Sequence, residues 1–203
     1  MKTVGLITEY NPFHSGHLYH MEEAKRQAGA AFSIALMSGN FVQRGEPSVF
    51  DKYTRTMAAL LAGADLVLEI PTPFSTASAR EFASYGVALL TALGVDSLVF
   101  GSECGELCLL QETASLLSSE TAAFQERLLL YQKQGLTYPQ ARARALERPD
   151  LLPLLENPNN ILGIEYLQAA VKLKSPMELL TIKRQGKHYH DTALPEEATD
   201  CPP

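Results

Sequence analysis

Residues 2–27 read KTVGLITEYNPFHSGHLYHMEEAKRQ, and this stretch decides the fold. Its first part, residues 2–8, clusters and alternates apolar side chains as a β-strand does. Asn11 and Pro12 then favour a turn, and residues 15–27 carry apolar side chains at helical spacing. The stretch therefore predicts a strand, a short loop and a helix, which is the unit that joins parallel strands.

The same unit recurs along the chain. We predict further strands at residues 32–37, 66–70, 97–100 and 178–183. We predict helices at residues 51–62 and 75–93, a mostly helical stretch at 106–146 and a helix that begins near 157–160. Parallel strands need helical crossovers, which cover both faces of the sheet. The fold class is therefore α/β: a Rossmann-like parallel sheet with helices on both faces, in one domain over residues 1–190, followed by a polar tail over residues 191–203.

Composition excludes several classes of protein. The chain has 203 residues, of which 46% are hydrophobic and 20% charged, so intrinsic disorder is excluded and a buried core is expected. No apolar stretch approaches the roughly 18 residues that a membrane span needs, and the N-terminus lacks the apolar region of a signal peptide. We therefore expect a cytoplasmic protein with no membrane association.

Charge and cysteine content limit the partners. Lys and Arg number 17 against 23 Asp and Glu, a net charge of −6, which argues against this chain alone gripping a nucleic acid by its phosphates. The cysteines Cys104, Cys108 and Cys201 form no CxxC pair and have no third ligand nearby, so we expect no metal site built by the protein.

The most specific motif is His14-Ser15-Gly16-His17, where the first predicted loop meets the first predicted helix. In parallel α/β sheets ligands bind beyond the carboxyl ends of the strands, and the free amides of a helix N-terminus favour anions. A phosphate is the natural guest. Two imidazoles three positions apart can both donate hydrogen bonds to negative charge that develops on a phosphoryl group. The alternative is that His14 and His17 only decorate a helix cap.

Six blocks carry a resemblance to a known family. They are, in order, EYNPFHSGH (9–17), SGNFVQRGEPSVFDKYTR (38–55), AGADLVLEIP (62–71), VFGSE (99–103), NNILGIEYL (159–167) and IKRQGKHYHD (182–191). HSGH is an HxGH element and resembles the HIGH-type nucleotidyltransferase superfamily. The ordered set resembles the tRNA(Met) cytidine acetate ligase family, of which this chain looks like the N-terminal catalytic domain. The resemblance implies adenylation of acetate by ATP, with Mg²⁺, and transfer of the acetyl group to the wobble cytidine of elongator tRNA(Met), giving N4-acetylcytidine.

The candidate catalytic residues are His14 and His17. The candidate ATP-binding residues are Ile7, Thr8, Glu9, Tyr10, Asn11, Pro12, Phe13, His14, Ser15, Gly16, His17, His20, Asn40, Arg44, Lys52, Gly101, Asn159 and Arg184. Each has an ordinary alternative: Arg44 and Lys52 as surface charge, Gly101 as a strand-ending turn, Arg184 as a solvated strand end and His20 as a surface residue. One of Asn159 and Asn160 is expected to cap its helix, and the family pattern favours Asn159 as the one that reads ATP.

Three functions follow from these features. The first is the acetate-adenylating, tRNA-modifying ligase or its N-terminal domain. The second is another HxGH adenylyltransferase, which acts on a phosphorylated small-molecule acceptor. The third is a nucleotide-binding domain without catalysis. Members of the resembled family continue into a motif like SATAIR and a helical region implicated in tRNA binding, which do not occur within these 203 residues. The resemblance therefore implies that tRNA binds mainly through such a C-terminal region.

Overall fold

The structure is a computed structural model that describes residues 1–119 and 121–184. The polar tail expected over residues 191–203, and the last residues of the expected domain, 185–190, lie outside the described residues.

Five parallel strands form one sheet. The strands are β1 (Thr3–Thr8), β2 (Phe32–Ser38), β3 (Leu66–Ile70), β4 (Ser97–Ser102) and β5 (Glu178–Lys183). They lie in the order β3-β2-β1-β4-β5, and all neighbouring pairs are parallel. The chain adds strands on one side of β1 and then crosses to its other side with β4. The order of the strands therefore reverses between β1 and β4, and the loops beyond these two strands flank the place where such sheets bind ligands.

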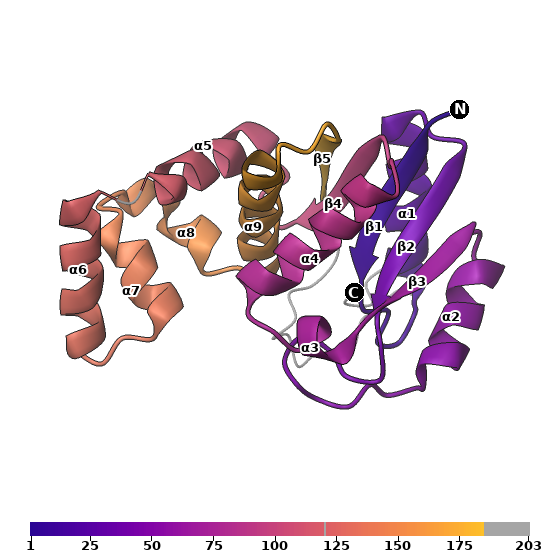
Figure 1. The fold of residues 1–203 in the computed structure, drawn as a ribbon, viewed down its shortest axis with the longest axis horizontal. Helices are drawn as coiled ribbons and strands as arrows, with labels where there is room; N and C mark the ends of the chain where they lie inside the picture. The colour runs from indigo at the N-terminus through magenta and orange to yellow at the C-terminus, as the bar shows by residue number, and fades with distance from the viewer. Residues whose placement is uncertain (120, 185–203) are drawn as a thin grey trace, which may run out of the picture.

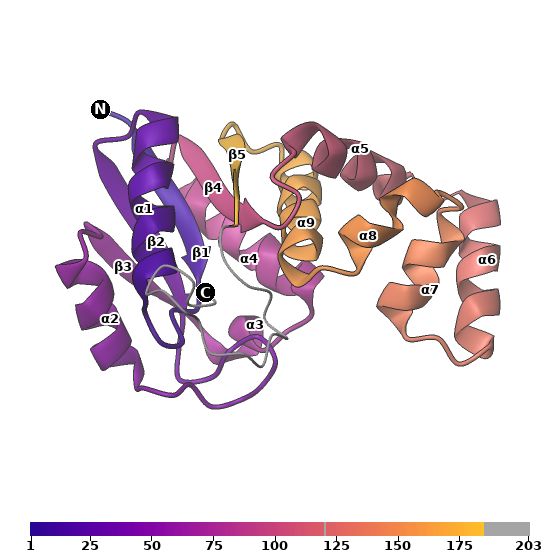
Figure 2. The ribbon, with the colours of Figure 1, turned by 180° about the vertical axis from the view of Figure 1, so that it is seen from behind.

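Helices cover both faces and extend beyond one end of the sheet. They are α1 (Ser15–Ala28), α2 (Lys52–Leu61), α3 (Thr72–Ser75), α4 (Ala79–Ala92), α5 (Leu107–Ser118), α6 (Ala122–Lys133), α7 (Tyr138–Ala145), η1 (Pro149–Leu151), α8 (Leu152–Leu155) and α9 (Pro158–Leu173). Figure 1 shows α4 and α9 in front of the sheet, and Figure 2, from behind, shows α1 and α2 on the other face. The predicted fold class is confirmed.

Two apolar cores separate these layers. On the α4 and α9 face, side chains such as Leu90, Leu98 and Ile164 pack together, and on the α1 and α2 face Leu6 and Met21 belong to a second cluster. This division follows from the strand sequences, because successive side chains of a strand point to opposite faces and both faces of this sheet are covered.

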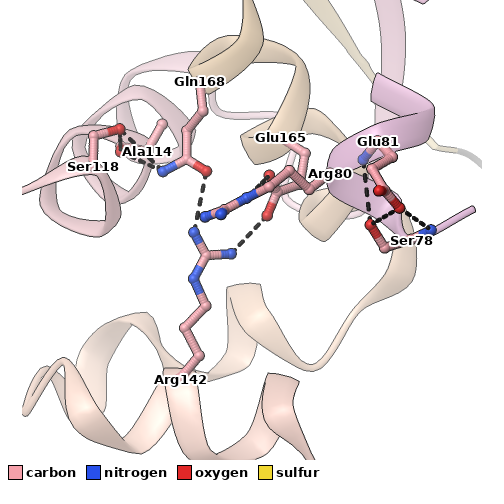
Figure 3. Close-up of polar contacts among 8 residues, drawn as sticks. All are labelled: Ser78, Arg80, Glu81, Ala114, Ser118, Arg142, Glu165 and Gln168. Atoms are coloured by element: carbon pink, nitrogen blue, oxygen red, sulfur yellow. Dashed lines mark hydrogen bonds and ion pairs between the residues drawn. The ribbon is translucent and has the colours of Figure 1, made fainter. Parts of the chain in front are cut away.

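The helices α6 and α7 lie at the end of the molecule away from the sheet (Figure 1). A polar network joins α7 to α9: the Arg142 guanidinium donates to Glu165 Oε1 at 2.6 Å and to Gln168 Oε1 at 3.2 Å (Figure 3). Arg80 of α4 approaches the other oxygen of Glu165 at 3.9 Å. Because Arg142 and Glu165 are both buried, their opposite charges compensate each other where water cannot.

Some predicted boundaries differ from the structure. The helix predicted at 75–93 begins later, at Ala79 of α4, because Ser78 and Glu81 form a capping box there, and Ser75 is the last residue of the short α3. The strand predicted at 97–100 continues to Ser102, where it still pairs with Lys183. The expectation that Asn159 or Asn160 caps its helix is wrong: the N-cap is Asn157, and Pro158 takes the first helical position that suits its ring.

Candidate functional site

The HSGH motif forms the N-terminus of α1, as the sequence predicted. His14 is the N-cap residue in extended conformation, and its Nδ1 accepts a hydrogen bond from the Gly16 amide at 3.1 Å. The imidazole rings of His14 and His17 are stacked, with centroids 3.8 Å apart and planes inclined by 26°. His14 therefore serves as a helix cap while it also presents its ring beside His17, so the two interpretations of this residue are compatible.

Burial keeps the imidazoles of His17, in the motif, and of His20, one turn later, neutral. It lowers the pKa of His17 to about 3, helped by repulsion from His14, His20 and Arg184 and opposed by the Pro12 carbonyl. It likewise lowers the pKa of His20 to about 4, with Arg184 adding to the effect. Within the described part of the chain, His17 Nδ1 and His20 Nε2 are buried atoms without a hydrogen-bond partner. Buried polar atoms are normally paired, so these nitrogens suit a site that a polar ligand completes.

The rings of Tyr10 and Phe13 pack against His17. Tyr10 adopts a positive φ of 49° and is 1% exposed, and its ring centroid lies 5.0 Å from that of His17 and 4.8 Å from that of Phe13. Burial raises the pKa of the Tyr10 hydroxyl to about 12. Tyr10 also packs in the core with Leu6 and Met21, so its ring supports the first loop from the protein interior.

Side chains of the first loop bind the loop that follows β2. Glu9 Oε1 accepts from the Gln43 amide at 2.7 Å, and Asn11 Oδ1 accepts from the Val49 amide at 2.7 Å. Burial raises the pKa of Glu9, against the lowering effects of the Gln43 amide and of Arg44 and Arg55. The loops beyond β1 and β2 are thus held together through two side chains that the sequence analysis placed in the ATP site.

Asn40 and Lys52 lie at the start of α2. Asn40 Oδ1 accepts from the Lys52 amide at 3.0 Å, while the Lys52 ammonium pairs with Glu69 of β3 at 2.6 Å. The N-cap of this helix is Asp51, and its carboxylate accepts from the amides of Tyr53 and Thr54. Both candidates therefore have partners inside the protein.

Arg55 of α2 is a buried residue that the sequence analysis did not single out. It is 1% exposed, and its guanidinium donates to the main-chain carbonyls of Glu9, Ser38, Gly39 and Phe50. Arg55 and Ala59, four positions apart, are the buried residues of α2. An arginine at the helical spacing of the buried face was the signal that could have found it.

A second cluster joins the end of β4 to the start of α9. The Glu103 carboxylate accepts from the amides of Asn159 and Asn160, at 3.2 and 2.8 Å, and from the Asn159 side chain at 2.7 Å. In return, Asn160 Oδ1 accepts from the amides of Glu103 and Cys104 at 3.0 and 3.2 Å. Asn159 therefore lies at the strand edge where it was expected, with its amide bonded to Glu103. The sequence did not indicate that the Asn160 side chain binds the main chain of Glu103 and Cys104.

Arg184 and Gly101 lie on neighbouring strands. The Arg184 amide donates to the Ser102 carbonyl at 2.9 Å, which extends the pairing of β4 and β5 by one residue. A Cβ added at Gly101 would lie 3.5 Å from Arg184 Cγ, an ordinary contact, so the protein itself does not require glycine there. Arg184 also lowers the pKa values of His17 and His20 by its charge, so it lies near enough to α1 to act on both imidazoles. Burial in turn lowers the pKa of Arg184.

The other candidates of the first loop lie where their sequence positions imply. Ile7 and Thr8 end β1, Ser15 and Gly16 begin α1, and Pro12 follows a cis peptide bond in the loop between them. The Thr8 hydroxyl donates to the Leu36 carbonyl of β2 at 3.3 Å.

Two surface hollows lie away from the HSGH helix start. A hollow of about 530 Å³ lies between α5 and α9, bordered by Gln111 and Val171, and another of about 350 Å³ lies between α3 and α4, bordered by Phe74 and Tyr85. Their linings include no candidate residue. Residues 1–119 and 121–184 contain no group of three His, Cys, Asp or Glu side chains that could hold a metal ion, and none of their helices is long and apolar enough to cross a membrane.

Comparison with known proteins adds a family and relatives. The family described as HIGH Nucleotidyl Transferase matches residues 1–200. Among curated proteins, the chain is 49% identical over 198 residues to the tRNA(Met) cytidine acetate ligase of Syntrophotalea carbinolica, covering 96% of this chain and 47% of that protein. It is 46% identical over 194 residues to the protein of the same name from Caldicellulosiruptor saccharolyticus, covering 96% and 48%. The chain thus spans about half the length of these relatives.

Solved structures agree with the fold. The apo structure of Thermotoga maritima TmcAL superposes with a TM-score of 0.90 at 42% identity, covering 98% of this chain and 50% of that one. A structure of the same T. maritima protein bound with alpha-thio ATP gives a TM-score of 0.87 at 43% identity, covering 92% and 47%.

Proposed function

The chain belongs to the HIGH nucleotidyl transferase family, and we propose that it is the ATP-binding, acetate-adenylating half of a tRNA(Met) cytidine acetate ligase. The observation that carries the proposal is the HSGH helix start, where His14 and His17 are stacked beside the crossover between β1 and β4 and the charge of Arg184 acts on His17. Relatives named for this activity match almost the whole chain, which supports the same assignment.

The proposed reaction has two steps. In the first, a carboxylate oxygen of acetate attacks the α-phosphorus of ATP; the bond to the bridging oxygen breaks, and pyrophosphate leaves with its electron pair. In the second, the N4 amine of the wobble cytidine attacks the acetyl carbonyl of the acetyl-adenylate. The amine loses a proton and AMP leaves. The first step increases negative charge on the phosphoryl oxygens, which the protein must stabilise.

The residues of the HSGH helix start suit the first step. A neutral imidazole carries one N–H donor, so His14 and His17 can donate to phosphate oxygens without first taking up a proton. The positive end of the α1 helix dipole favours an anion, and Arg184, directly after β5, supplies a guanidinium. Hydrogen bonds to a charged group contribute roughly 1.5–3 kcal/mol each, so two such donors change the rate measurably.

Mg²⁺ remains a prediction. Mg²⁺ at nucleotide sites is held mainly by substrate phosphates and one or two carboxylates, with waters completing its shell. When bound, the ion would neutralise phosphate charge, and Glu9 and Glu103, which directly follow β1 and β4, are the carboxylates that would hold it.

The proposal is tested by exchange of labelled pyrophosphate into ATP. Acetate is expected to stimulate the exchange, and propionate much less, although a single methylene discriminates by only about 1–3 kcal/mol. Exchange or adenylation that requires a phosphorylated acceptor instead of acetate would favour another HxGH adenylyltransferase. ATP binding without exchange under any carboxylate would favour a nucleotide-binding domain that does not catalyse the first step by itself.

A further inference from the structure

Arg55 is a buried cation whose hydrogen bonds all go to the main chain. Its Nε donates to the Phe50 carbonyl at 3.1 Å, and its Nη2 donates to the Ser38 carbonyl at 3.2 Å and to the Gly39 carbonyl. Its Nη1 donates to the Glu9 carbonyl. A planar guanidinium has five N–H donors in a fixed fork, so one side chain can hold several carbonyls in a defined arrangement.

These carbonyls come from three segments that meet beyond the sheet edge. Glu9 follows β1 and leads into the HSGH loop, Ser38 and Gly39 end β2, and Phe50 precedes α2. The same two loops are joined by Glu9 to the Gln43 amide and by Asn11 to the Val49 amide. Arg55 therefore lies behind the place where the first loop, which carries His14 and His17, is fastened to the second.

Arg142 offers an internal comparison. It is also a buried arginine, but it pairs with the Glu165 carboxylate and the Gln168 side chain between α7 and α9 (Figure 3). Arg142 thus joins helices, whereas Arg55 binds loop carbonyls beside the candidate site. Burying a charge costs free energy unless hydrogen bonds compensate it. An apolar side chain on the buried face of α2 would carry no such cost.

We propose that Arg55 is a positioning residue that fixes the loops beyond β1 and β2, and thereby sets the HSGH motif for nucleotide binding. The nucleotide part of this inference rests on the proposed function; the loop-fixing part does not. The hydrogen bonds of Arg55 go to main-chain carbonyls, so it acts through the positions of Glu9 and Gly39. Its effect on ATP is therefore indirect, and loop order is the quantity that it controls.

The test compares Arg55→Met and Arg55→Lys with Arg142→Met in the 203-residue chain. Amide hydrogen exchange by NMR is measured at Gln43 and Val49, which report the contact between the two loops, and at Glu103 and Cys104, which report the cluster beyond β4. ATP affinity is measured by calorimetry at a temperature well below the unfolding transition of each variant. Arg55→Lys keeps the charge and loses the fork, so it remains informative if Arg55→Met does not fold.

We expect faster exchange at Gln43 and Val49 in both Arg55 variants, with Glu103 and Cys104 unchanged. We expect the ATP affinity to fall by about tenfold or more, because ATP must then order the loops on binding. Arg142→Met is expected to leave the exchange rates of the four amides unchanged and the ATP affinity within about twofold of the wild type, because well-separated sites act independently. Unchanged exchange at Gln43 and Val49, or an equal rise at all four amides, would overturn the inference. If the wild-type chain binds no ATP, the proposed function fails, while the exchange pattern still decides whether Arg55 fixes the loops.

Discussion

The imidazole rings of His14 and His17 are stacked 3.8 Å apart at the start of α1. Two protonated rings at this separation would repel each other, and burial together with His14, His20 and Arg184 lowers the pKa of His17 to about 3. At neutral pH His17 is therefore a neutral hydrogen-bond donor, and its partner ring lies beside it on the same side of the helix start.

Replacing the two histidines tests their part in adenylation. We expect His14→Ala and His17→Ala each to slow acetate-dependent pyrophosphate exchange by about 10- to 100-fold, the equivalent of one hydrogen bond to a charged group. ATP affinity, measured separately by calorimetry, should fall much less, because the proposed bonds strengthen as charge grows in the transition state. An equal loss in both quantities would make the rings ground-state anchors of ATP.

Acid should destabilise the folded chain through His17 and His20. Their pKa values in the folded chain are about 3 and 4, below the value of about 6.5 that they regain on unfolding. A base with a lowered pKa contributes stability that is fully present above pH 6.5 and is lost as the pH falls toward the folded value. At about pH 5 each histidine should cost up to about 2 kcal/mol of unfolding free energy.

Urea unfolding at about pH 7 and pH 5 measures this effect, and His20→Gln isolates one contribution. The variant should lose less stability on acidification than the wild type. The same loss in both proteins would show that His20 is not held neutral in the folded chain.

Asn160 should contribute strongly to the stability of the β4 loop. It is 1% exposed, and its side-chain oxygen accepts from the amides of Glu103 and Cys104. Asn160→Ala leaves both amides without that acceptor and should lower the free energy of unfolding by about 2 kcal/mol or more. Asn157→Ala is the matched control, since the Asn157 side chain makes no capping bond, and should cost about 0.5 kcal/mol. Similar costs for the two variants would contradict this role of Asn160.

The division between the two halves of the relatives predicts how tRNA is bound. This chain has a net charge of −6 and spans about half the length of its curated relatives. Docking a polyanion needs basic surface, so we expect the 203-residue chain to acetylate tRNA(Met) weakly or not at all in the presence of ATP and acetate. A longer protein with a basic helical C-terminal region should restore the reaction with a strong salt dependence. Efficient, salt-insensitive acetylation by the 203-residue chain would contradict this division.

The sequence predicted the periodic parts of the molecule well. The resemblance drawn from the six blocks is confirmed at the level of the family, the strands at 66–70 and 178–183 have the predicted bounds, and α1 begins at the predicted Ser15. These features depend on local patterns, in which apolar spacing and turn residues determine each element. The short α3 and the start of α4 at Ala79 were missed because the apolar pattern continues across the Ser78 capping box.

The site was predicted at the level of its loops and missed at the level of contacts between them. Position after a strand placed Glu9 and Asn11 beyond the edge where the carboxyl ends of the parallel strands lie together, and the family resemblance assigned Asn159, at a helix start, to the same site. That these side chains bind Gln43, Val49 and Glu103 depends on how separate loops meet, which no local pattern records. The same is true of Arg55, whose four acceptors lie on three different segments.

The binding of ATP at the HSGH helix start is measured by amide chemical shifts during an ATP titration of the 203-residue chain. We expect saturable shifts at Ile7 to His17, at Gly101 to Glu103, and at Asn159 and Arg184, with the hollow between α5 and α9 unaffected. Shifts confined to that hollow, or no saturable shifts at millimolar ATP, would contradict it.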